Sequence, residues 1–357
     1  MDSSELGVKV TSNKGKIGLQ SHRLQRVVAS AFKRAKLVPR QEESDRISGL
    51  PDPLLHHILS FLPIKEAIAK SLILSKRWTP LGLAMPALDI HDFGFSSLHS
   101  FIQFVDAVLF LSDPNPINMF RLKCQRFRVP SIRINPWIKS IMNHKVQHLE
   151  LCFADLNSYR HVDVPACIFH SSTIKVLKLA KVMLNARSVN SPSLKVLHLV
   201  KVQFSNPESA ANIPNGCSLL EDLVLKTWST PIGHFRIGRF EHFASAEVQP
   251  SWIPLTAFSN VRLLRIELDL IFKRSLVESM LDIPQCLSTH HKKFCLGEYR
   301  GSECEFELAT FIMKNSSALR NISIYSSTKE NVDSKHQMLR RLSSCPRGSL
   351  NCRLLFN

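Results

Sequence analysis

A short pattern of apolar residues recurs along this chain and limits what it can fold into. It consists of an apolar residue, two residues of any kind, a second apolar residue, one residue of any kind and a third apolar residue. The pattern occurs at Ile117/Phe120/Leu122, Val146/Leu149/Leu151, Ile174/Leu177/Leu179, Leu194/Leu197/Leu199, Leu220/Leu223/Leu225, Val261/Leu264/Ile266 and Leu319/Ile322/Ile324. Its last two apolar residues are two positions apart, so in a strand they point to one face of a sheet. A single unit cannot bury that face, and the pattern therefore predicts stacked units that share one apolar interior.

The spacing of these units indicates the kind of stack. Their middle residues are separated by 29, 28, 20, 26, 41 and 58 positions. The first four spacings are close to the period of leucine-rich repeats, roughly 20–29 residues. The last two are long enough to contain degenerate repeats or insertions. The chain thus resembles an irregular leucine-rich-repeat array, which we assign to residues 93–282, and the fold class that this implies is an α/β solenoid. Apolar residues at helical spacing predict connecting helices around 98–109 and 137–141.

The residues that alternate with the buried pairs are expected to point outward on the concave face of the sheet. Extended faces of this kind bind partners. The side chains that we expect to contact a target protein are Arg121, Lys123, His148, Glu150, Lys178, His198, Lys226, Arg265 and Tyr325. Because acids such as Asp222 and Glu267 share this face, it differs from the more uniformly basic groove that tracks phosphates.

Residues 45–92 read as a small helical module. Asp52 is expected to cap a helix that has Pro53 in its first position. Leucine and isoleucine follow at helical spacing until Pro63, which stops the helix. A second helix is expected to begin near Lys65.

The letters of this module are specific. Arg46, Leu50-Pro51-Asp52, Phe61-Leu62-Pro63 and the LSKRW segment that ends at Trp78 resemble a plant F-box. That resemblance implies docking on a Skp-type adaptor and, through it, on a cullin. The implied contact residues are Leu50, Pro51, Leu54, Leu55, Ile58, Leu59, Leu62, Pro63, Leu74 and Trp78. Two features depart from the family pattern: the segment before LSKRW is one residue longer, and Gly82 stands where a second tryptophan is usual.

The C-terminal segment, residues 283–357, resembles the FBD region of plant F-box/LRR proteins. Ser302 and Glu305 form the capping-box spacing, which predicts a helix start. The helix is expected to end at Asn315, and a further helix is expected to begin around Met338. Repeat arrays need terminal caps, so we expect this segment to cap the array.

The net charge of +17 is concentrated in part at the N-terminus. Residues 1–40 contain nine lysines and arginines but only two acids, and we interpret residues 1–44 as a basic, disordered extension. This charge leaves contact with nucleic acid as an alternative partner class. We expect no membrane partner, because the longest apolar window, FIQFVDAVLFL, is short and contains Asp106.

No motif for catalysis, phosphate binding or metal binding is found, and we expect no catalytic residue, cofactor or metal. The nine cysteines contain no CxxC pair, which favours reduced thiols in the cytoplasm or nucleus. The function implied by the resemblance is that of a non-catalytic substrate-recognition subunit of an SCF-type (Skp–cullin–F-box) ubiquitin ligase. The alternatives are a ligase-independent interaction scaffold with an impaired F-box, and a nucleic-acid-associated protein that uses its basic arm.

Overall fold

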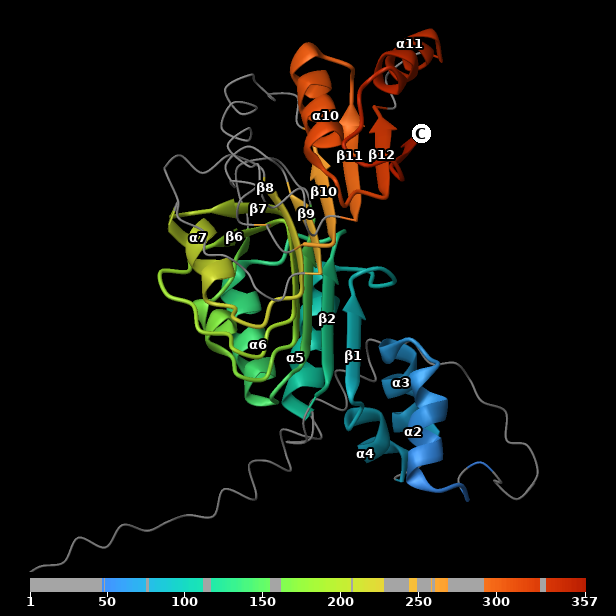
Figure 1. Cartoon of the computed structure of the whole chain (residues 1–357). Helices are drawn as coiled ribbons and strands as arrows, with labels where there is room; N and C mark the ends of the chain where they lie inside the picture. The colour runs from blue at the N-terminus through green and yellow to red at the C-terminus, as the bar shows by residue number, and fades with distance from the viewer. Residues whose placement is uncertain are drawn as a thin grey trace, which may run out of the picture. The chain divides into compact units, whose positions relative to one another are not determined.

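The computed structural model describes residues 47, 49–74, 77–111, 117–154, 162–206, 208–227, 244–248, 258, 261–268, 292–327 and 332–357. The basic extension assigned to residues 1–44 lies outside them. The chain divides into two compact units, Met1–Asn115 and Pro116–Asn357. Figure 1 shows the elements in chain order. None of the described helices is both long enough and apolar enough to cross a membrane.

The first unit is mostly helical. Its elements are α2 (Asp52–Ser60), α3 (Ile64–Leu74), α4 (Trp78–Leu83), β1 (Ala87–His91) and α5 (Leu98–Leu111). Pro63 separates α2 from α3, as expected for a residue that cannot continue a helix. Because this unit extends to Asn115, the expected boundary between residues 92 and 93 falls inside it.

The expectation that Asp52 caps α2 is wrong. Asp52 is the first residue of the helix, Pro51 occupies the capping position, and no side chain caps the helix. The Asp52 carboxylate instead accepts a hydrogen bond from Arg77 Nη2 at 2.6 Å. The negative charge still lies in the first turn, where the helix dipole favours it.

The second unit is built on parallel strands. In the order in which they pair, these are β2 (Met119–Cys124), β3 (His148–Phe153), β5 (Val176–Ala180), β7 (Val196–Phe204), β8 (Asp222–Thr227), β9 (Ser245–Val248), β10 (Leu263–Glu267), β11 (Lys293–Tyr299), β12 (Asn321–Ser326) and β13 (Arg353–Phe356). Two short strands, β4 (Val162–Asp163) and β6 (Val182–Leu184), pair beside β7.

The strand register follows the predicted apolar pattern. The middle residues of successive units pair directly, as in Phe120 with Leu149, and Leu149 with Leu177. All residues of the seven patterns are buried, with exposed fractions of 3% or less. The prediction that stacked strands share one apolar interior is therefore confirmed.

The two long spacings between patterns contain additional strands. β9 lies between β8 and β10, and its Ala246 pairs with both Leu223 and Leu264. β11 lies between β10 and β12, and its Phe294 pairs with Leu264 and Ile322. The ladder thus continues without a change of direction through the regions where the pattern is weak.

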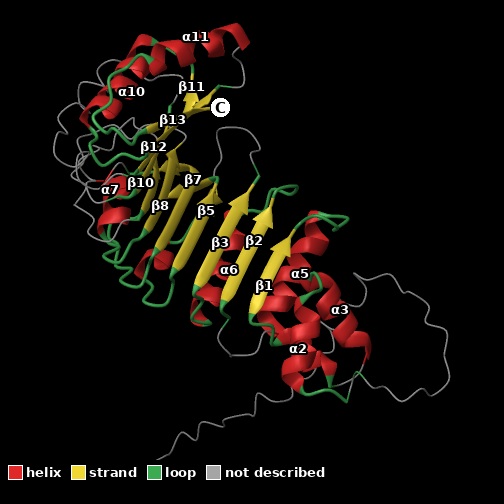
Figure 2. Ribbon diagram, turned by 45° about the vertical axis from the view of Figure 1, so that its right-hand side comes forward, coloured by secondary structure: helices red, strands yellow, loops and turns green. Residues whose placement is uncertain are grey.

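Helices connect the strands. They are α6 (Ser131–Asn143), the 3₁₀ helix η1 (Ala166–His170), α7 (Glu208–Asn215), α10 (Glu303–Asn315) and α11 (Val332–Ser343). The expected apolar stripe of α6 is buried, including Trp137, Ile138 and Ile141. Figure 2 shows α6 behind β2 and β3, on one face of the sheet. The polar residues that alternate with the buried ones point to the opposite face.

The C-terminal segment extends the same sheet. β11, β12 and β13 continue the parallel pairing after β10. The predicted capping box at the start of α10 is present, because Ser302 Oγ accepts from the Glu305 amide while Glu305 accepts from the Ser302 amide. The segment therefore adds further strands and helices to the parallel array.

Candidate functional site

The first candidate surface is an apolar strip on and just after α2, formed by Leu54, Ile58 and Phe61; we call it the adaptor strip after the docking that the sequence resemblance implies. Leu54 is 49% exposed, Ile58 is 40% exposed and Phe61, just after the helix, is 73% exposed. Leu54 and Ile58 are four residues apart, so they lie on one side of the helix. Exposed apolar side chains in a group are typical of a surface that a partner covers.

The other implied adaptor contacts fall into two groups. Leu55, Leu59 and Trp78 are buried, and in this structure they form the core of the first unit and leave little surface for a partner. The remaining ones are exposed or half-buried: Leu50, Pro51, Leu62, Pro63 and Leu74. Phe61 was not singled out from the sequence, although it stands within the Phe-Leu-Pro letters that carry the resemblance.

Arg77 connects α4 to α2 by hydrogen bonds. Its Nη2 atom donates to the Leu50 carbonyl at 2.7 Å and to Asp52 at 2.6 Å. The start of α4 is thereby connected to the start of α2. The contact joins the Leu-Pro-Asp segment to the LSKRW segment, although Asp52 and Arg77 are 25 positions apart in the sequence.

The second candidate surface is the outward face of the parallel sheet. On β2, β3 and β5 it carries a basic patch, defined as Arg121, Lys123, His148 and Lys178 around Glu150. Arg121 Nε lies 2.8 Å from Glu150, Lys123 lies 3.7 Å from it and His148 lies 4.0 Å from it. Glu150 also pairs in register with Lys178 on β5. Sequence reasoning placed these five side chains on one face, and the structure brings them together.

Farther along the same face the charges balance. Lys226 on β8 forms ion pairs with Glu247 on β9 and Glu267 on β10. Arg265 lies 3.2 Å from Glu247 and stacks 5.0 Å from the ring centre of Tyr325. We call these residues the balanced cluster.

His198 and Glu247 are two further residues of this face. His198 pairs with Asp222 at 2.9 Å and separates the balanced cluster from the basic patch. Glu247 was missed from the sequence because β9 did not match the apolar pattern.

Titration in the basic patch reflects both burial and charge. Burial alone would raise the pKa of Glu150, but the hydrogen bond from Arg121 and the charges of Arg121, Lys123 and Lys178 outweigh it and lower that pKa. Burial lowers the pKa of His148, and the charges of Lys178 and Arg121 add to this effect against the opposing charge of Glu150. The arrangement therefore favours an ionised Glu150 beside a neutral His148.

The balanced cluster shows the opposite outcome for a lysine. Burial would lower the pKa of Lys226, but its contacts with Glu247 and Glu267 raise it overall. Lys226 thus stays charged, and its ammonium group is already engaged by Glu247 and Glu267. It is therefore less available to a ligand than a lysine without such ion pairs.

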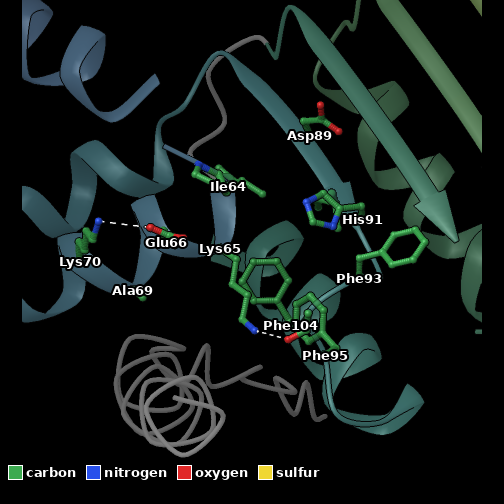
Figure 3. A pocket seen from close by; sticks show the side chains of 13 residues that line it. Ile64, Lys65, Glu66, Ala69, Lys70, Asp89, His91, Phe93, Phe95 and Phe104 are labelled. Atoms are coloured by element: carbon green, nitrogen blue, oxygen red, sulfur yellow. Dashed lines mark hydrogen bonds and ion pairs between the residues drawn. The ribbon is translucent and has the colours of Figure 1, made fainter. Parts of the chain in front are cut away.

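A pocket of about 410 Å³ lies within the first unit, between α3 and the segment that contains β1 (Figure 3). Lys65 Nζ donates to the Gly94 carbonyl at 2.8 Å and lies 4.3 Å from the centre of the Phe95 ring. Lys70 pairs with Glu66 at 3.3 Å. Both lysines in its wall therefore have partners within the unit. Across the residues that the structure describes, no group of three or more His, Cys, Asp or Glu side chains is arranged to hold a metal.

Comparison with protein families gives three matches along the chain. An F-box domain model matches residues 47–79. A model described as FBD-associated F-box protein At5g56370, LRR repeats, matches residues 134–243, and an FBD model matches residues 279–324. The order agrees with the resemblance drawn from the sequence, and the adaptor strip lies inside the first match.

Curated proteins of Arabidopsis thaliana are similar to this chain. F-box/FBD/LRR-repeat protein At5g22700 is 37% identical over 183 residues, which cover 51% of this chain and 41% of that protein. F-box/FBD/LRR-repeat protein At5g56420 is 25% identical over 88% of this chain and 99% of its own length. F-box/LRR-repeat protein At3g59200 is 36% identical over 51% of this chain and 36% of its own. The match thus spans less than half the length of the first and third of these relatives.

Proposed function

We propose that this chain, which carries F-box, leucine-rich-repeat and FBD segments in the order of the plant F-box/FBD/LRR-repeat proteins, is a substrate-recognition subunit of an SCF-type ubiquitin ligase. The observation that carries the proposal is the adaptor strip within the F-box match. In this role the protein has no catalytic residues of its own, and it acts in the cytoplasm or nucleus, where such ligases act.

In this proposal the two units have separate tasks. The adaptor strip binds a Skp-type adaptor and, through it, a cullin. The outward face of the parallel sheet binds a target protein and holds it for ubiquitin transfer by the other subunits. The nine outward residues predicted from the sequence, from Arg121 on β2 to Tyr325 on β12, are the proposed target contacts.

The size of the adaptor strip fits a docking role. Complete burial of one large apolar side chain is worth about 1.5–3 kcal/mol. Leu54, Ile58 and Phe61 are between 40% and 73% exposed, so a partner that covers them removes a substantial apolar area from water. The buried neighbours Leu55 and Leu59 fix the helix against the unit, which presents the strip without large rearrangement.

The test is capture of a Skp-type adaptor by the full chain. The double variant Leu54→Asp/Ile58→Asp places two charges in the contact. Burial of these charges without partners costs about 2 kcal/mol or more. Adaptor capture is expected to disappear. The control is Ile132→Asp/Leu350→Asp, which places the same charges at two exposed apolar positions of the second unit.

Both variants are first compared with the parent chain by circular dichroism and limited proteolysis. Capture that survives in the folded Leu54→Asp/Ile58→Asp variant contradicts the docking surface. Absence of capture by the parent chain contradicts the ligase role and leaves the interaction scaffold as the alternative.

A further inference from the structure

The outward face of the sheet is electrostatically uneven. The basic patch places three permanent cations, Arg121, Lys123 and Lys178, around the single carboxylate Glu150. In the balanced cluster, Lys226 and Arg265 face the two carboxylates of Glu247 and Glu267. Of these two groups of charges, only the basic patch on β2, β3 and β5 has an excess of cations.

Lys178 is the cation of the patch that is most available to a ligand. Its ammonium group forms no ion pair or hydrogen bond within the described part of the chain. It is nevertheless close enough to Glu150 and His148 to affect both side chains electrostatically. The Nε2 atom of His148 is buried and has no hydrogen-bond partner among the described residues. Lys178 is thus a cation of the patch that Glu150 does not hold by a hydrogen bond or ion pair.

The extent of the patch suits a short peptide segment. Neighbouring strands are about 4.8 Å apart, so the distance from β2 to β5 across β3 is about 10 Å. Three residues of an extended chain have that length, at about 3.3 Å per residue. Figure 2 shows these three strands side by side.

The carboxylates on the same face argue against a nucleic-acid strand. A phosphate backbone that ran along the sheet from the basic patch would next meet the balanced cluster, where Glu247 and Glu267 already pair with Lys226 and Arg265, so it would gain little further attraction there. A local group of carboxylates meets only the patch.

We infer that the basic patch on β2, β3 and β5 binds a short acidic segment of the target protein, with Lys178 as its principal free cation. This inference rests on the proposed function, because it gives the chemistry of the target that the repeat face would hold. Glu150 orders Arg121 and Lys123 in the empty patch, and it competes with the incoming carboxylates.

The experiment measures binding of a fluorescent hexaglutamate peptide to the full chain by fluorescence anisotropy. Lys178→Glu is expected to weaken binding about tenfold, the scale of a close charge pair. Glu150→Gln removes the competing carboxylate and is expected to tighten binding, which a misfolded variant would not do. Lys139→Glu makes the same change of net charge on the exposed side of α6 and is expected to leave binding within about twofold.

The outcomes separate this inference from its alternatives. Equal weakening by Lys178→Glu and Lys139→Glu overturns it, because binding then follows net charge. Tighter binding of a single-stranded oligodeoxythymidine with the same dependence on Lys178 also overturns it, in favour of phosphate. Adaptor capture by the Lys178→Glu variant is measured in parallel, so failure of the peptide with capture intact rejects the inference alone.

Discussion

Gly82 lies where α4 packs against Ser71 of α3. A Cβ atom at this position would lie 2.0 Å from Oγ and 2.6 Å from Cβ of Ser71, which is buried. The family pattern has a tryptophan here, and this packing leaves no room for one. The departure from the pattern is therefore matched by a close helix contact that only glycine allows.

Gly82→Ala is expected to lower the free energy of unfolding of the first unit by about 1–3 kcal/mol, the usual cost of overpacking. Chemical denaturation measures it. Ser71→Gly removes the opposing side chain, so the double variant should lose less stability than the sum of the two single variants. Additive losses would show that the two positions do not meet.

His148 links stability to pH. Its pKa in the folded chain is below the ordinary value of 6.5, so between these two values the unfolded chain binds more protons than the folded chain. The groups that face it are Arg121 on β2, Lys178 on β5 and Glu150 on its own strand. Acidification through this window therefore favours unfolding.

The prediction compares the parent chain with His148→Gln between about pH 7.5 and pH 5.5. The parent should lose stability toward the acid end, and the variant should lose less, because it lacks the titrating ring. Thermal denaturation across the series measures this difference. Identical pH dependence in both proteins would show that His148 titrates normally.

At the scale of elements, three of the missed strands have a polar or small residue at one position of the apolar pattern, whereas β1 was missed although it carries the pattern in full at Met85, Leu88 and Ile90. β11 has His291 three residues before Phe294, where the other units have an apolar residue. β13 has Asn351 at the corresponding position before Leu354. β9 carries the small Ala246 in its middle position.

For β9 and β11 these gaps have a physical reason. Each lies between two registered neighbours, whose backbone hydrogen bonds help to fix it, so it needs less apolar area of its own. Glu247 was missed together with its strand, and Arg77 received no role because its contacts with Leu50 and Asp52 are distant in sequence. Phe61 received none because the sequence pattern does not give its exposed fraction. The alternation of β2 to β7, by contrast, was sufficient to place the basic patch.

The parallel sheet predicts different losses of stability for substitutions at two neighbouring residues of β7. Leu197→Ala removes a buried side chain from the shared interior and should cost about 2–5 kcal/mol of unfolding free energy. His198→Ala changes the adjacent outward residue, whose pair with Asp222 is partly exposed, and should cost about 1 kcal/mol or less. Chemical denaturation of the two variants checks the ratio. Comparable losses would contradict the assignment of the two faces.

At the scale of the whole molecule, the division into two units predicts that the two binding activities can be separated. The adaptor strip lies in the first unit and the basic patch in the second. Leu54→Asp/Ile58→Asp should abolish adaptor capture and leave the affinity for hexaglutamate unchanged. Lys178→Glu should weaken peptide binding about tenfold and leave adaptor capture intact. Both measurements use the full chain at matched concentration, with Ile132→Asp/Leu350→Asp as the common control. Loss of both activities in either variant would mean that the variant has lost its fold or that the two surfaces are energetically coupled, and circular dichroism distinguishes these cases.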